Sequence, residues 1–191
     1  MREVLFSALG LSVLLSISGQ SVAQTKVEQL PDGVVNYIKA SEVADASKPP
    51  QPGVKSTDVT MLRVLGVNKG EYAVGIAVLN RPKTPAGQDG GGLEEHTDIT
   101  EVYQILSGHA TFVSGGTLTN MKPETPINTK IGPGFHGDTI QGGVTREIGP
   151  GDMVIIPPMT PHWWKQITSD QLVYTVVRID PHHVLSMPPA K

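Results

Sequence analysis

The sequence predicts an all-β domain, either a sandwich or a barrel. Glycine (21) and proline (16) are abundant among the 191 residues, and they separate short apolar runs, as is typical of many short strands joined by turns. After the N-terminal apolar segment, no stretch keeps a 3.6-residue period over the length of a helix. The apolar fraction of 38% is enough for a core. The length suits one domain with tails.

Residues 1–23 are expected to be a secretory signal peptide. An apolar run, Val4–Ile17, is too short to span a bilayer comfortably, and small residues at Ser21 and Ala23 suggest cleavage after Ala23. We therefore expect a secreted or periplasmic protein with no stable membrane insertion after cleavage. The alternative is an uncleaved membrane anchor.

Residues 24–56 are polar and contain the pair Pro49–Pro50, so we expect an extended N-terminal arm or linker. Within it, Val34–Lys39 could form a short strand. The barrel is expected at 57–181, and a C-terminal tail at 182–191.

The strands expected in the barrel are short, and turn residues bound them. A long insertion is expected at 120–138. Pairs of strands are expected to turn at Ser107–Gly108 and at Gly142–Gly143. The strand-like segments are Asp58–Val67, Glu71–Asn80, Glu101–Gly108, His109–Gly116, Gly151–Pro158 and Leu172–Asp180.

Charge and cysteine content exclude several function classes. The formal net charge is -3 and the sequence pI is about 6.0, so there is no basic footprint for nucleic acid. The chain contains no cysteine, which rules out cysteine-ligated zinc, iron–sulfur clusters and thiol nucleophiles.

Two motifs carry the chemistry. The first has the spacing E-x-H-x4-E-x6-G and the second G-x5-P-x4-H-x3-Q. Both stand in order and are flanked by expected strands. Their residues are Glu94, His96, Glu101 and Gly108, then Gly151, Pro157, His162 and Gln166.

Together the two motifs resemble those of the cupin superfamily. The resemblance implies a double-stranded β-helix, or jelly-roll barrel. It also implies a metal bound by His96, Glu101 and His162. Two departures concern the site: Glu94 stands where the family pattern has a histidine, and Gln166 where it has asparagine. Glu94 could be a fourth ligand, a general base or a solvated acid at the barrel mouth.

Strand alternation supports the same grouping, because residues i and i+2 share a face. Glu94 can therefore point the same way as His96, and Glu101 the same way as Tyr103. His162, Trp164 and Gln166 would also share one face. Imidazole and carboxylate suit a divalent transition metal, namely Fe, Mn, Zn or Ni.

Roles beyond the metal stay open at this point. Tyr103 is an acid–base candidate with Glu94, or a core residue. Trp164 and Gln166 could line a substrate pocket, with packing as the alternative for Trp164. Arg178 is expected to face outward, with an inward anion anchor as the alternative.

The remaining histidines are expected to lie outside the site. His109 is expected in solvent, and His182 and His183 in the tail. His136 is expected to be an incidental loop histidine, unless its loop folds over the barrel mouth.

Two functions fit these observations. The first is a metal-dependent enzyme acting on a small polar molecule, of the dioxygenase, decarboxylase, isomerase or lyase type. The alternative is a non-catalytic exported protein that binds or sequesters a small ligand. We also expect a homodimer, because single-domain cupins often pair through edge strands, and the arm could cover an edge of the partner.

Overall fold

The computed structural model describes residues 27–49 and 59–187. The signal peptide expected at residues 1–23 lies outside these ranges. Within them, no helix is both long and apolar enough to cross a membrane. The elements are β1 (Glu28–Gln29), α1 (Ala40–Ala46), β2 (Thr60–Val67), a 3-10 turn (Asn68–Gly70), β3 (Tyr72–Pro82), β4 (Glu94–His96), β5 (Thr100–Ser107), β6 (Ala110–Ser114), β7 (Thr117–Leu118), β8 (Lys122–Pro123), β9 (Gly134–His136), β10 (Ile140–Gln141), β11 (Val144–Ile148), β12 (Met153–Ile156), β13 (His162–Ile167) and β14 (Gln171–Asp180).

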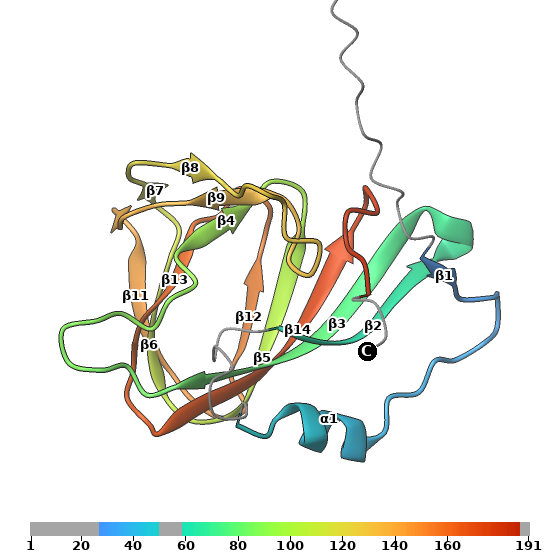
Figure 1. Ribbon diagram of the computed structural model, residues 1–191, viewed down its shortest axis with the longest axis horizontal. Coiled ribbons are helices and arrows are strands. Elements are labelled where there is room, and N and C mark those ends of the chain that lie inside the picture. Colours follow the sequence, from blue (N-terminus) through green and yellow to red (C-terminus); the bar gives the residue numbers. More distant parts are fainter. Residues whose placement is uncertain (1–26, 50–58, 188–191) are drawn as a thin grey trace, which may run out of the picture.

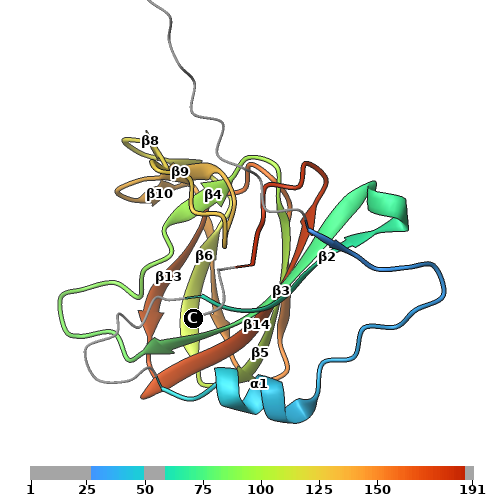
Figure 2. The ribbon, with the colours of Figure 1, turned by 45° about the vertical axis from the view of Figure 1, so that its right-hand side comes forward.

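Two six-stranded sheets form the barrel (Figures 1 and 2). The first sheet has the order β1-β2-β3-β14-β5-β12, and the second has the order β11-β6-β13-β4-β9-β8. From β3 to β6 the chain alternates between the sheets, and from β11 to β14 it alternates back. The returning strands pair antiparallel with the outgoing ones, as β14 with β3, β13 with β4, β12 with β5 and β11 with β6. This rolled antiparallel ribbon is a double-stranded β-helix, so the expected all-β jelly roll is confirmed.

Aromatic side chains fill the core between the sheets. Tyr103, Phe112, Trp164 and Tyr174 are all buried. Trp164 lies 4.8 Å from Phe112 and 5.0 Å from Tyr174 between ring centroids, within the range of favourable aromatic pairs. This cluster packs directly against the candidate site, so the site rests on rigid core packing.

The two expected turns join different sheets. β5 pairs with β12 and β14, whereas β6 pairs with β11 and β13. The turn at Ser107–Gly108 is therefore a corner of the barrel, and the expected strand pair is wrong. The same correction applies to Gly142–Gly143, because β10 pairs with β7 and β11 pairs with β6. A tight turn predicts a reversal of the chain but not which sheet the next strand joins. The hairpin of β2 with β3 is confirmed.

The N-terminal arm is more structured than expected. Residues 40–46 form the short helix α1, while the strand expected at Val34–Lys39 is absent and β1 pairs parallel with β2 instead. Glu42 caps the helix by accepting the backbone N–H of Lys39 at 2.9 Å, and it pairs with Arg63 of β2 at 2.8 Å. Seven residues are too few to show a helical period. The arm lies along the first sheet of its own barrel (Figure 1).

A candidate metal centre in the barrel

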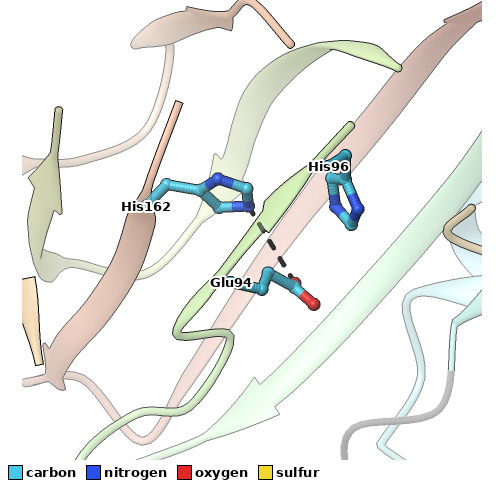
Figure 3. A group of neighbouring side chains, drawn as sticks. All are labelled: Glu94, His96 and His162. Carbon is cyan, nitrogen blue, oxygen red and sulfur yellow. Dashed lines mark ion pairs between the residues drawn. The ribbon is translucent and has the colours of Figure 1, made fainter. Parts of the chain in front are cut away.

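Three side chains from two neighbouring strands converge inside the barrel (Figure 3). Glu94 and His96 stand two apart on β4, so they share its inner face. His162 is the first residue of β13 and lies opposite Glu94 in the strand register. One donor atom from each of the three lies within 4.8 Å of the others. This is a His/Glu group that could hold a metal ion.

Three of the four ring nitrogens of His96 and His162 lack hydrogen-bond partners. Both nitrogens of His96 and Nε2 of His162 are buried and unsatisfied, although buried polar groups in proteins are nearly always paired. Nδ1 of His162 lies 3.0 Å from the carbonyl oxygen of Thr160 and donates to it, and in a neutral imidazole this arrangement leaves a lone pair on Nε2. That nitrogen lies 3.4 Å from Glu101 Oε2 and 3.9 Å from Glu94 Oε1. A lone pair facing carboxylate oxygens is unfavourable unless a cation lies between them.

The donor set and its spacing fit a divalent transition metal. Protein ligands bind such ions at about 2.0–2.2 Å, and two ligands of a tetrahedral ion are then about 3.4 Å apart. Glu101 Oε2 is 3.5 Å from His96 Nε2 and 3.4 Å from His162 Nε2. Burial lowers the pKa of His96 and keeps its imidazole neutral, as metal binding requires.

Glu101 is fully buried and held from two sides. Nε of Arg178 donates to Oε1 at 2.7 Å, and the hydroxyl of Tyr103 donates to Oε2 at 2.8 Å. Burial alone would raise the pKa of Glu101, but the charge of Arg178, with help from the two histidines, lowers it to about 2. Glu101 is therefore a fixed anion between the histidines and Arg178, and the proposal that it is also a ligand remains a prediction.

Glu94 is the most accessible member of the group. Its side chain is 14% exposed, compared with 1% for His162. Burial alone would raise the pKa of Glu94, but the electrostatic interactions with His96, His162 and Arg81 outweigh burial and lower it. An ionised carboxylate at this position can bind a metal or accept a proton from a substrate, and the position at the cavity wall permits both roles.

A cavity of about 230 Å³ adjoins the group and could hold a small molecule. Glu94 and Tyr103 lie at its inner wall, and two arginines from β3 and β14 also line it. Its lining residues are Val59, Leu79, Arg81, Gly92, Glu94, Tyr103, Glu124, Asn128, Ile131, His136, Tyr174 and Arg178.

Both arginines point into the barrel. This contradicts the expectation for Arg178, and no prediction was made for Arg81. Arg178 is only 3% exposed and bonds to Glu101, so the expected outward position is wrong. Alternation along β14 would have indicated it, because Arg178 shares a face with the buried Tyr174 and Val176. Arg81 was missed, although it follows Leu79 on the inner face of β3.

The insertion at 120–138 covers the barrel mouth. Its strand β9 pairs with β4 and places His136 opposite Glu94, and His136 contacts Glu124 through a short ion pair. Both residues line the cavity. The expectation of an incidental loop histidine at His136 is therefore wrong, since the insertion adds strands to the second sheet.

The other expected pocket residues differ in placement. Tyr103 lines the cavity, and burial raises its pKa well above 10, so it acts as a hydrogen-bond donor. Trp164 is packed in the core against Tyr103, with ring centroids 6.0 Å apart. Gln166 is exposed, because a β-bulge between Trp164 and Gln166 shifts the alternation and turns Ile167 inward. The expectation that Gln166 shares the ligand face is therefore wrong.

Two histidines expected to lie outside the site do so. His109 is exposed at the corner after β5, and the side chain of His182 is 62% exposed beside Asp98.

Comparison with known proteins yields only remote likenesses. The sequence matches no protein-family model and no curated protein. Among solved structures, a Bacillus halodurans protein is 12% identical with a TM-score of 0.49, covering 87% of this chain and 92% of that one. A Klebsiella pneumoniae protein with a double-stranded beta-helix domain is 10% identical with a TM-score of 0.42, covering 74% and 89%. A Cupin 2 conserved barrel domain protein from Salinispora arenicola is 18% identical with a TM-score of 0.40, covering 72% and 90%. At these values the likenesses carry no inference about activity.

Proposed function

We propose that the protein is a metal-dependent enzyme of the cupin superfamily that acts on a small polar molecule. The observation that carries the proposal is the set of buried, unpartnered ring nitrogens on His96 and His162. They face the carboxylates of Glu101 and Glu94, and Glu94 also lines a cavity. The two motifs and the rolled ribbon support membership in the superfamily. The fold by itself does not decide between an enzyme and a binding protein.

Different residues of the chain have different roles at such a site. His96 and His162 would hold the metal, with Glu94 or Glu101 as carboxylate ligand. A divalent metal in this position would supply Lewis-acid polarisation of a substrate oxygen. Glu94 reaches the cavity as a carboxylate, so it is the favoured proton acceptor. Tyr103 orients Glu101 through its hydroxyl hydrogen bond, and the buried Arg178 keeps that carboxylate ionised.

Export is part of the proposal and rests on the sequence alone. The apolar run within residues 1–23 and the small residues at Ser21 and Ala23 support cleavage that leaves Gln24 as the first residue.

The metal is tested by elemental analysis of the purified protein and of two matched histidine variants. His162→Ala removes a buried nitrogen of the group and should lose most of the metal. His109→Ala changes an exposed histidine and should keep it. Less than about a tenth of an equivalent of transition metal in the reconstituted wild type would contradict the proposal. Equal metal in His162→Ala and wild type would contradict the assignment of the site.

Turnover is tested separately from metal binding. The metal-loaded protein would be assayed for oxygen uptake and for product formation with catechols, dicarboxylates and sugars. A protein that holds metal, binds such a molecule and does not convert it would favour the non-catalytic binding function.

A further inference from the structure

Arg81 is a buried cation that forms no ion pair with any described residue. Only 6% of the surface of Arg81 is exposed. Nε donates to the hydroxyl of Tyr174 at 2.9 Å and Nη1 donates to the carbonyl oxygen of Gly90 at 3.3 Å, and both acceptors are neutral. In the described ranges, 27–49 and 59–187, no carboxylate forms an ion pair with Arg81 and Nη2 makes no hydrogen bond. Because a guanidinium stays charged, burying it unpaired costs free energy.

The other charged groups at the cavity are paired or belong to the metal group. Arg178 pairs with Glu101, and His136 pairs with Glu124. Glu94 faces His162 within the metal group. Arg81 forms no ion pair with any described residue of the cavity wall, although Glu94 acts on its charge at longer range. It faces space large enough for a small molecule.

The surrounding chain is shaped to hold this guanidinium in place. The hydroxyl of Tyr174 also accepts a hydrogen bond from the indole N–H of Trp164 at 3.1 Å. The hydroxyl that accepts from Arg81 is therefore held in position by the aromatic core. The loop before β4 passes close to Arg81 at Gly91 and Gly92, which have φ values of 78° and 66°. A Cβ on these residues would lie 3.2 Å from Nη1 and 3.0 Å from Nη2. Glycines there leave room for the planar end of the side chain.

We propose that Arg81 binds the carboxylate group of a small carboxylic acid in this cavity, with the rest of the molecule directed to the metal group. The inference rests on the proposed function, whose substrate class it names. Guanidinium groups match carboxylates in geometry and form strong charge-assisted hydrogen bonds with them. A single unbalanced positive charge suits a monoanionic group better than a phosphate dianion, which would also face Glu94 and Glu124.

The test compares binding of carboxylates with binding of their neutral amides by titration calorimetry. Lactate, succinate and benzoate would be titrated into the metal-loaded protein, with lactamide, succinamide and benzamide as counterparts. At least one carboxylate should bind, and about tenfold or more tighter than its amide, because one charge-assisted hydrogen bond commonly accounts for that ratio. Inorganic phosphate should bind more weakly than that carboxylate. Equal or tighter phosphate binding, or no preference for any carboxylate over its amide, would overturn the proposal.

Two variants locate the effect at Arg81. Arg81→Met should abolish the preference for carboxylate, and Arg81→Lys should keep the preference with weaker binding. Arg146→Met, at an exposed arginine of β11, should behave as wild type. Unchanged carboxylate preference in Arg81→Met would overturn the assignment.

Thermal unfolding gives a second readout that does not depend on activity. Removal of an unpaired buried charge should leave the Tm of Arg81→Met equal to or above that of the wild type without ligand. Added carboxylate should raise the wild-type Tm and not that of Arg81→Met. An equal rise in both proteins would contradict the proposal.

Metal analysis of the same samples separates the proposed metal-dependent function from the proposed carboxylate binding by Arg81. Arg81→Met should retain wild-type metal. If the wild type holds no metal, the proposed function fails, and the comparison of carboxylate with amide on the metal-free protein still decides the role of Arg81.

Discussion

Single residues in the barrel are explained by the charges around them. Glu101 can stay ionised in a dry interior because Arg178 and Tyr103 bond to its two oxygens. His162 presents Nε2 to the site because Thr160 occupies Nδ1. The resemblance to the cupin motifs implied that His96, Glu101 and His162 come together. It did not predict Arg178 as the counter-ion, since that pairing joins strands far apart in the chain.

Glu94 is the residue whose role the spacing left open, and the structure places it with the two histidines. We expect Glu94→Gln to lower metal affinity by at least about tenfold, a loss seen on removal of even an outer partner of a metal ligand. Competition with a fluorescent chelator would measure the affinity. Glu147→Gln, at an exposed position of β11, is the control. Unchanged affinity together with lost activity would instead assign Glu94 as a general base.

Individual elements show where local patterns hold and where they break. Alternation along β4 and β5 places the inner residues correctly from sequence, and alternation along β14 would have placed Arg178 inward with Tyr174 and Val176. On β13 the alternation holds for His162 and Trp164 and then fails at the β-bulge, so Gln166 points outward. A bulge leaves no clear mark in one sequence, because it depends on the register of the partner strand. The glycines of the loop before β4 are also not predictable from local sequence. A side chain at these positions would contact Arg81 or Trp164, which lie on other strands.

This loop provides a prediction with a matched control. Gly92 and Gly87 both have positive φ, but only at Gly92 would a Cβ approach Arg81. Alanine at either position should lower the free energy of unfolding by about 1–2 kcal/mol through backbone strain. Only Gly92→Ala should also weaken carboxylate binding, because it displaces the guanidinium. Denaturant unfolding would measure the change in stability, and calorimetry would measure carboxylate binding. Equal binding by both variants would contradict the role of Gly92 in positioning the guanidinium of Arg81.

At the scale of the whole molecule, the rolled ribbon brings distant segments to one end of the barrel. The strand β4 lies between the returning strand β13 and β9 of the insertion at 120–138 (Figure 2). The outer face of the first sheet carries a cross-strand row of apolar residues that ends at the edge strand β12. The row consists of Ile155, Val102, Val177 and Ile76.

The homodimer remains a prediction. A substitution in this apolar row tests whether the two copies associate through it. Ile155 is 70% exposed on an edge strand, and such edges commonly pair with another copy. Light scattering should give a dimeric mass for the wild type and a monomeric mass for Ile155→Glu. Ile127→Glu, at a loop position that is 56% exposed, should remain dimeric. A monomeric wild type would contradict the prediction.

The sequence by itself determined the all-β class and the principal strands, because turn residues and strand alternation are local properties of the chain. The grouping of His96, Glu101 and His162 was implied by the resemblance of the two motifs to those of the cupin superfamily. Only the tertiary structure decided that donor atoms of Glu94 and both histidines lie within 4.8 Å of one another, that Arg178 pairs with Glu101, and that Arg81 and His136 line the cavity. Alternation can give the face on which a side chain lies, but its partner depends on packing, and Arg178 of β14 pairs with Glu101 of β5, a strand distant in sequence.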